Sequence, residues 1–146
     1  MHFLGDDPVN TSALSSHSGK VLSLLRIVAG LMFMQHGLQK IFGFPAEAMG
    51  PFVLMSQMGI GGVLELVGGA LIALGLFTRP VAFILSGMMA VAYVQFHWAF
   101  GSASFFPLVN KGELALLYSF VFLYFVFAGP GEWALDNMLG RKRRRY

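Results

Sequence analysis

The sequence predicts an all-α fold, an integral membrane four-helix transmembrane bundle, from its composition and from four separate apolar stretches. Of its 146 residues, 56% are hydrophobic and only 12% are charged, and the mean hydropathy is +0.68. A soluble domain is about a quarter charged, so this chain has too few charges to cover a surface that faces water. Its length allows a single domain.

The apolar stretches are placed by the thickness of the bilayer. A spanning helix needs ~20 apolar residues, because ~30 Å of hydrocarbon is crossed at ~1.5 Å per residue. We predict spans at about residues 21–42, 58–77, 80–100 and 110–128. The fourth is short, since its apolar run proper covers only about residues 113–128, so we expect it to begin earlier in the chain.

The ends of the chain differ from the membrane domain, which we place at residues 20–137. Residues 1–19 are polar and Ser-rich, which predicts a disordered tail, and residues 138–146 form a basic tail. Between the second and third spans, the sequence Thr78-Arg79-Pro80 predicts a tight turn.

The orientation follows from the distribution of Lys and Arg. Lys20, Arg79 and the basic tail fall on one side of four spans, whereas Lys40 and Lys111 fall on the other. The positive-inside rule therefore predicts that both termini are cytoplasmic. Five of the ten basic residues lie at positions 141–145, and such a run beside a membrane helix indicates topology and anionic lipid. We expect membrane lipid, and no nucleic acid, as a partner.

Polar residues within the apolar stretches gather toward the outer face of the membrane. The first and third spans end at that face, and the second and fourth begin there. The polar site predicted at this level consists of His36, Gln39, Lys40, Glu65, His97 and Glu113. Glu65 shares a helical stripe with Gly61, Gly69 and Ala73, and small residues mark the packing seam between membrane helices. We therefore expect Glu65 to face the interior, with Lys40, His36 or His97 as its cationic partner.

A structural interpretation competes with a functional one at each position. Glu65 is as well explained by a bond that pins two helices together as by a pocket. Lys40 and Glu113 lie near the interface and could extend into water. The histidines are more often structural, and Arg26, about one turn inside the cytoplasmic boundary, is expected to extend its charge to that surface.

The sequence gives little support for thiol chemistry, haem binding or metal binding. The chain has no Cys, which excludes disulfides and thiolate chemistry. His36 and His97 could reach one depth on facing helices, but no spacing motif supports a haem there, and we predict no metal site. No cofactor is assigned from the residues, although a quinone would suit an apolar cavity with a few hydrogen-bonding groups.

Several motifs together resemble the DoxX family, over about residues 20–137. In the first span these are Arg26, Gly30, His36-Gly37, Lys40 and Phe42-Gly43. In the second span and the turn after it they are Glu65, Gly68-Gly69, Leu74-Gly75-Leu76 and Thr78-Arg79-Pro80. In the fourth span and its exit they are Asn110, Gly112-Glu113-Leu114-Ala115, Gly129-Pro130-Gly131 and Leu135-Asp136.

The resemblance implies a four-helix protein of the bacterial inner membrane. Members of the family are associated with redox complexes, either in quinone-linked thiosulfate oxidation or in an assembly with superoxide dismutase and a sulfurtransferase. The family supplies no agreed catalytic residues, only recurring polar positions, which are His36, Lys40, Glu65 and Glu113 here.

Three functions remain open at this point. The first is an accessory or scaffold subunit of a membrane redox complex, which is not an enzyme by itself, has protein partners and interacts with a quinone. The second is a small transporter or channel for a solute or for protons. The third is a structural or lipid-binding module. A homo-oligomer is compatible with all three.

Overall fold

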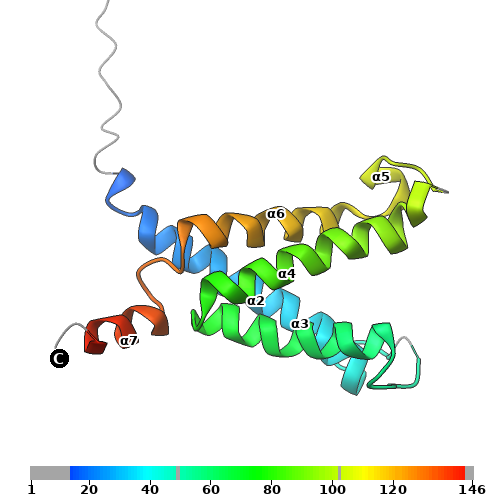
Figure 1. The fold of residues 1–146 in the computed structure, drawn as a ribbon, viewed down its shortest axis with the longest axis horizontal. Coiled ribbons are helices and arrows are strands. Elements are labelled where there is room, and N and C mark those ends of the chain that lie inside the picture. The colour runs from blue at the N-terminus through cyan, green and yellow to red at the C-terminus, as the bar shows by residue number, and fades with distance from the viewer. Residues whose placement is uncertain (1–13, 49, 102, 144–146) are drawn as a thin grey trace, which may run out of the picture.

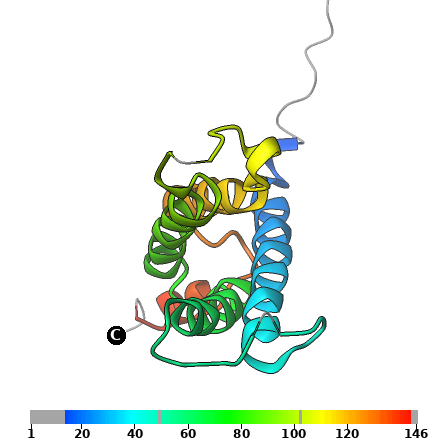
Figure 2. The same ribbon diagram turned by 90° about the vertical axis from the view of Figure 1, so that its right-hand side faces the viewer.

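The computed structural model describes residues 14–48, 50–101 and 103–143, and the long elements within them are helices. Four apolar helices lie side by side (Figure 1): α2 Ser18–Phe42, α3 Gln57–Leu74, α4 Thr78–Ala92 and α6 Glu113–Ala128. Figure 2 shows them end-on, at the corners of one bundle. The all-helical membrane bundle predicted from the sequence is confirmed.

The lengths of these helices match a bilayer to different degrees. Three stretches are long and apolar enough to cross it, namely Ser18–Phe42, Gln57–Leu74 and Thr78–His97. The last of these includes a π-helix, Tyr93–His97, that continues α4. The fourth helix, α6, has only 16 residues, and it does not extend back toward Asn110 because Lys111 and Gly112 separate it from the short helix α5, Pro107–Asn110.

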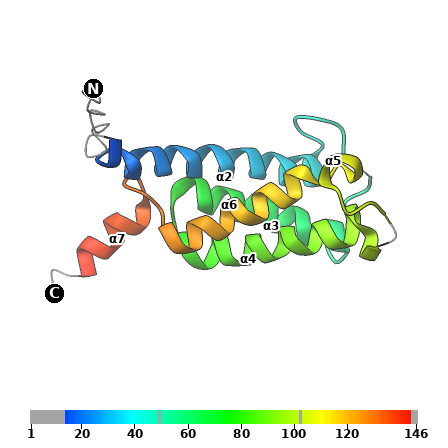
Figure 3. The same cartoon turned by 90° about the horizontal axis from the view of Figure 1, so that it is seen from above.

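The two ends of the bundle carry different structures (Figures 1 and 3). The termini end holds the start of α2, the α3–α4 turn, an exit segment of residues 129–134 and helix α7, Leu135–Arg143. The loop end holds the loops of residues 43–56 and 98–112, including a 3₁₀ turn at Ala99–Gly101 and α5.

The end of α3 and the start of α4 differ from the boundaries predicted from the sequence, because of the backbone conformation between them. Helix α3 ends before Gly75, which has a φ of 67°. Helix α2 likewise ends before Gly43, which has a φ of 66°. Glycine adopts this left-handed conformation at low cost. The predicted turn at residues 78–80 is instead the first turn of α4, and Pro80 fits there because that turn needs no amide donor at its start.

The predicted tails are partly helical in the described residues. Residues 1–13 of the amino-terminal tail lie outside those residues, but Ser18 and Gly19 already belong to α2. In the basic tail, α7 continues to Arg143, and residues 144–146 lie outside the described part of the chain.

Glycines allow α2 and α3 to approach very closely. A Cβ built on Gly37 would lie 2.4 Å from the backbone nitrogen of Leu66, and one on Gly69 would lie 2.7 Å from that of Met34. A Cβ on Gly61, by contrast, would meet nothing within 4 Å. The predicted stripe of small residues therefore holds for Gly69 but is wrong for Gly61.

Large aromatic side chains fill the middle of the bundle. Phe33 of α2 meets Tyr118 and Phe122 of α6 edge-on, with ring centroids 5.1 and 4.9 Å apart. Phe125 is also buried in this core. On the outside, Phe120 and Phe127 are 61% and 75% exposed, as expected for side chains that face lipid tails.

Candidate functional site

A buried ion pair joins α2 to α3 in the loop-end half of the bundle. The Nζ atom of Lys40 lies 2.6 Å from Oε1 of Glu65 and donates a hydrogen bond to it. The Glu65 side chain is 8% exposed and that of Lys40 is 21% exposed. The sequence predicts that Glu65 turns inward toward a cation, and the structure places Lys40 there.

The close contact of α2 and α3 at Gly37, Gly62 and Gly69, here called the glycine seam, positions this pair. Gly62 lies one turn before Glu65, and a Cβ on it would be 3.1 Å from Cβ of Lys40. Helices this close allow the Lys40 side chain to cross to α3. An isolated charge in hydrocarbon costs ~2.5–3.5 kcal/mol on insertion scales, so each member of the pair makes the burial of the other tolerable.

Glu65 and Tyr118 each have one buried polar atom without a hydrogen-bond partner in the described part of the chain. Oε2 of Glu65 is buried and has no hydrogen-bond partner among the described residues, and the same holds for Oη of Tyr118. The carboxylate oxygen is an acceptor and the phenol is a donor. Buried polar atoms are nearly always satisfied, so atoms like these call for a ligand, a water or a partner.

His36 lies against Tyr118 rather than against Glu65. The two rings are perpendicular, with centroids 6.5 Å apart, and the imidazole is half-buried. His36 and Lys40 are four residues apart on α2 and share a face. His36 therefore extends the polar region from the ion pair toward α6.

His97 belongs to a different cluster, which corrects the expectation that it would meet Glu65. Its Nδ1 lies 3.2 Å from the carbonyl oxygen of Asn110, and its ring stacks on Tyr93 at 6.4 Å. No bond between His97 and Glu65 occurs in the described residues. The physical reason is the π-helix, because its wider turn rotates the following residues away from the face that a regular α-helix would give them.

Asn110 organises this second cluster, which holds the loop between α4 and α6. Its Nδ2 donates to the carbonyl of Ser104 at 2.8 Å and to Oη of Tyr93 at 3.3 Å. Its Oδ1 accepts from the amide of Gly112 at 2.7 Å. Tyr93 in turn donates to the carbonyl of Phe105. The residues of this cluster therefore stabilise the loop.

Gln39 and Glu113, the remaining predicted site residues, do not join the ion pair. Nε2 of Gln39 donates to the carbonyl of Glu47 in the loop after α2, at 3.1 Å. Glu113 is exposed in the first turn of α6, where its charge favours the helix amino terminus. Of the six predicted residues, the structure thus joins Lys40 and Glu65, with His36 nearby on α2.

Arg26 forms a second buried polar site, at the termini end. The prediction that its side chain extends to the membrane surface is wrong. The residue is 0% exposed. Its Nε donates to the carbonyl of Pro130 at 2.8 Å, and its Nη2 to that of Trp133 at 2.5 Å. Its Nη1 donates to Ala73 at 2.6 Å and also to Ile72. Burial is tolerated because the carboxyl end of α3 and the exit segment supply these carbonyls.

The sequence held a signal for this burial. Arg26 lies four residues before Gly30, which packs on α3 with an added Cβ only 2.5 Å from the nitrogen of Ala73. The same periodicity that turned Glu65 inward also turns Arg26 inward. The missing information was the exit segment, which covers Arg26 from outside the spans.

Further hydrogen bonds hold the exit segment and α7 against the bundle. Oγ of Ser23 accepts from the amide of Trp133 at 3.0 Å. The carboxylate of Asp136 accepts from the amides of Phe77 at 2.8 Å and Thr78 at 2.9 Å, and so caps the start of α4. The end of α6 is thereby tied to α2, α3 and α4.

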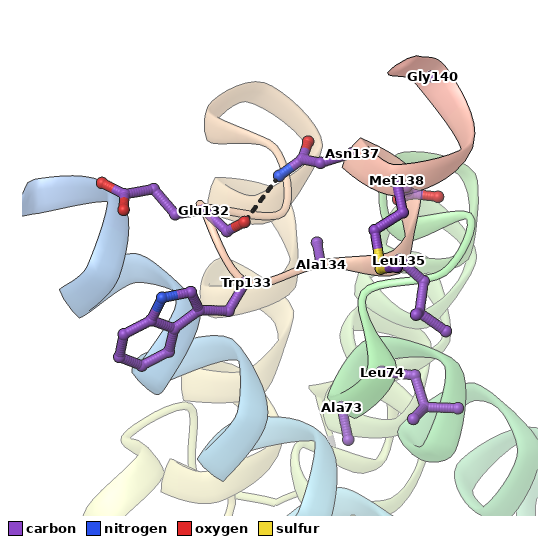
Figure 4. A pocket seen from close by; sticks show the side chains of 10 residues that line it. Ala73, Leu74, Glu132, Trp133, Ala134, Leu135, Asn137, Met138 and Gly140 are labelled. Carbon is purple, nitrogen blue, oxygen red and sulfur yellow. Dashed lines mark hydrogen bonds between the residues drawn. The ribbon is translucent and has the colours of Figure 1, made fainter. Parts of the chain in front are cut away.

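An open cleft of about 960 Å³ lies beside this segment (Figure 4). Its walls come from the end of α3, the exit segment and α7, and include Ala73, Leu74, Trp133, Leu135 and Met138. Within the described part of the chain, no three His, Asp or Glu side chains are grouped to hold a metal ion.

Comparisons with known proteins agree with the membrane architecture. Residues 21–98 match the family model DoxX. An uncharacterized protein of Haemophilus influenzae is 49% identical over 128 residues, covering 83% of this chain and 92% of its own. An uncharacterized membrane protein of Mycobacterium tuberculosis is 32% identical over 136 residues, covering 81% and 80%.

A third relative is the inner membrane protein YqjF of Escherichia coli, which is 30% identical over 122 residues, covering 80% of this chain and 90% of its own. No solved structure matches. The family model spans the helices that carry Arg26, Lys40 and Glu65, and relatives match over most of their length. The chain belongs to the DoxX family of membrane proteins.

Proposed function

We propose that this protein is an accessory or scaffold subunit of a membrane-bound redox complex, and that its Lys40–Glu65 site binds a quinone. The membrane would be the bacterial inner membrane, with both termini in the cytoplasm. The observation that carries the proposal is a buried ion pair with one unpaired carboxylate oxygen. Intramembrane ionisable groups are usually functional.

The unused hydrogen-bonding groups of Glu65 and Tyr118 suit this ligand class. A quinone offers carbonyl acceptors and its reduced form offers hydroxyl donors. Tyr118 has an unused donor and Glu65 an unused acceptor, so the groups could serve either form. Phe33 and Phe122 beside Tyr118 supply an aromatic environment, which favours a flat apolar ring.

The scaffold role draws on the architecture and the family. The extensive apolar surface includes Phe83 at 67% and Phe127 at 75% exposure, enough for both lipid and membrane partners. The family resemblance points to redox assemblies. The scaffold proposal therefore rests on an apolar surface that can anchor the protein in the membrane, together with a small polar interior.

The ligand test is extraction and chromatography of quinones from protein purified in mild detergent. We expect a quinone with the wild type and at least about a tenfold loss with Glu65→Gln or Tyr118→Phe, since each removes or weakens a buried hydrogen bond of ~1.5–3 kcal/mol. Tyr124→Phe is the matched control, because Tyr124 is 56% exposed. Wild-type protein without quinone would remove the ligand part of the proposal.

The partner test is purification of the tagged chain from its native membranes, followed by mass spectrometry. We expect redox enzymes in the eluate, retained when the membranes are solubilised gently and absent from an untagged control. An eluate that holds the chain alone would contradict the scaffold role, whatever the quinone result.

A further inference from the structure

The loop between α4 and α6 exposes a group of large apolar side chains. Residues 98–110 include no charged residue. Four side chains in the second half of this loop are 61–76% exposed, namely Phe105, Phe106, Leu108 and Val109. An exposed apolar patch marks a surface that contacts a membrane or a protein. Residues 105–109, which include most of the short helix α5, are called the apolar segment below.

Helix α6, which follows the apolar segment, is too short to cross the hydrocarbon of a bilayer. Its 16 residues span about 24 Å at ~1.5 Å per residue, which is ~6 Å less than the ~30 Å of hydrocarbon. The carboxyl end of α6 lies at a polar boundary, because the exposed Arg79 donates to the carbonyls of Val126 and Phe127 there. The shortfall therefore lies at the amino-terminal end of α6, next to the apolar segment.

The apolar segment lies on the outside of the bundle and is set back from its tip. Helix α5, yellow in Figure 2, lies beside α6 on the outer side of the bundle. The turn Ala99–Gly101 lies farther out along the bundle axis than α5 does (Figures 1 and 3). Exposed apolar side chains therefore extend from α6, at Leu117 and Phe120, into the segment that precedes it in the chain.

Hydrogen bonds within the loop satisfy polar groups of the apolar segment. The carbonyl of Phe105 accepts from Oη of Tyr93, and the carbonyl of Phe106 accepts from the amide of Asn110 at 3.0 Å. Pro107 has no amide hydrogen that needs a partner, and its carbonyl accepts from the amide of the residue after α5. Internal pairing of this kind suits apolar surroundings, because lipid tails offer no hydrogen bonds.

We propose that the apolar segment is an interfacial anchor, whose side chains Phe106, Leu108 and Val109 insert among the acyl chains of the leaflet at the loop end. Interfacial segments reach ~5–10 Å into the boundary between headgroups and acyl chains, and the ~6 Å shortfall of α6 falls in this range. Lys111 is exposed directly after the segment, where its long side chain extends to the headgroups. The inference goes beyond the quinone site and does not depend on it.

The experiment is spin labelling of the full-length protein in vesicles of phosphatidylcholine and phosphatidylglycerol. The chain has no cysteine, so Leu108→Cys provides a unique labelling site. Collisions of the label with oxygen report lipid, and collisions with a water-soluble nickel chelate report water. We expect the ratio of oxygen to nickel collisions to be at least about threefold higher at Leu108→Cys than at Ala103→Cys, and to place the label ~5–10 Å below the phosphates.

Three further labelling sites calibrate the measurement. Ala103→Cys is the matched control in the same loop, because Ala103 is exposed and residues 101–104, Gly-Ser-Ala-Ser, include no large apolar side chain. Phe120→Cys is the lipid reference, since Phe120 is exposed in the middle of α6. Val109→Cys repeats the test beside Leu108. The circular dichroism spectrum of each variant, compared with the wild type, establishes that it is folded.

Frequent nickel collisions at Leu108→Cys, as at Ala103→Cys, would overturn the proposal, because the apolar segment would then lie in water. Rare collisions with both reagents would also overturn it, because protein would then cover the segment. Dipolar broadening between labels would identify that protein as a second copy of the chain. The proposal requires frequent oxygen collisions and rare nickel collisions at both Leu108→Cys and Val109→Cys.

Discussion

At the scale of single residues, three charged side chains within the bundle are the main polar features: Arg26 and Glu65, which are buried, and Lys40, which is partly buried. Two different arrangements compensate these charges. Glu65 and Lys40 neutralise each other across the α2–α3 seam, whereas Arg26 is surrounded by backbone carbonyls. Periodicity in the sequence predicted the inward direction of Glu65, because seam residues are spaced by whole turns. It could not supply the carbonyl partners of Arg26 in the exit segment, Pro130 and Trp133, which are more than 100 residues away in the chain.

The ion pair predicts strongly non-additive substitutions. Lys40→Met leaves a buried carboxylate without its cation and should lower the free energy of unfolding by about 3 kcal/mol. The double variant Lys40→Met with Glu65→Leu removes both charges and should lose less than the first variant alone. Unfolding in mixed micelles, followed by circular dichroism, measures both. Costs that simply add, from Lys40→Met and Glu65→Leu, would show that the pair does not form.

Arg26 predicts a difference between two cationic residues. Arg26→Lys keeps the charge but cannot reach four carbonyls, because lysine lacks the planar fork of donors. We expect faster hydrogen exchange at the amides of Trp133 and Asp136, by about tenfold or more for each ~1.4 kcal/mol lost. Arg79→Lys is the control, since Arg79 is exposed and bonds to the end of α6. Unchanged exchange in Arg26→Lys would mean that Arg26 does not hold the exit segment.

At the scale of the helices, close approach and local irregularity determine which residues meet. The sequence predicted each apolar helix and its packing by small residues. It did not predict the π-helix at Tyr93–His97, because a single extra residue in a turn leaves no mark in apolar periodicity. At the end of this π-helix, the His97 ring contacts the carbonyl oxygen of Asn110 instead of Glu65.

The glycine seam predicts opposite effects for two glycines of α3. Gly69→Ala places a methyl group 2.7 Å from a backbone nitrogen of α2, and the overpacking should cost about 1–3 kcal/mol. Gly61→Ala meets open space and should be neutral or stabilise the helix by up to about 1 kcal/mol. The same unfolding measurement compares them. Equal effects at Gly61 and Gly69 would contradict the observed α2–α3 packing.

At the scale of the whole molecule, hydropathy predicted the class of protein and most of the spans. The balance of 56% hydrophobic and 12% charged residues excludes a soluble surface. The sequence did not predict that α7 and the exit segment fold back on the bundle, because their bonds connect distant parts of the chain. The sequence likewise predicted only part of the candidate site. Lys40 and Glu65 on the α2–α3 seam met as expected, whereas His97 at the end of the π-helix and Glu113 in α6 did not join them.

The most direct test of the architecture is whether α6, with only 16 residues, crosses the membrane. The chain has no cysteine, so single cysteines at His17, Ala48, Ala103 and Gly140 can be probed with a thiol reagent that does not cross membranes. Four crossings predict that His17→Cys and Gly140→Cys react only after the cells are opened, whereas Ala48→Cys and Ala103→Cys react in intact spheroplasts. Reaction of His17→Cys and Gly140→Cys from opposite sides would contradict the four-helix membrane bundle.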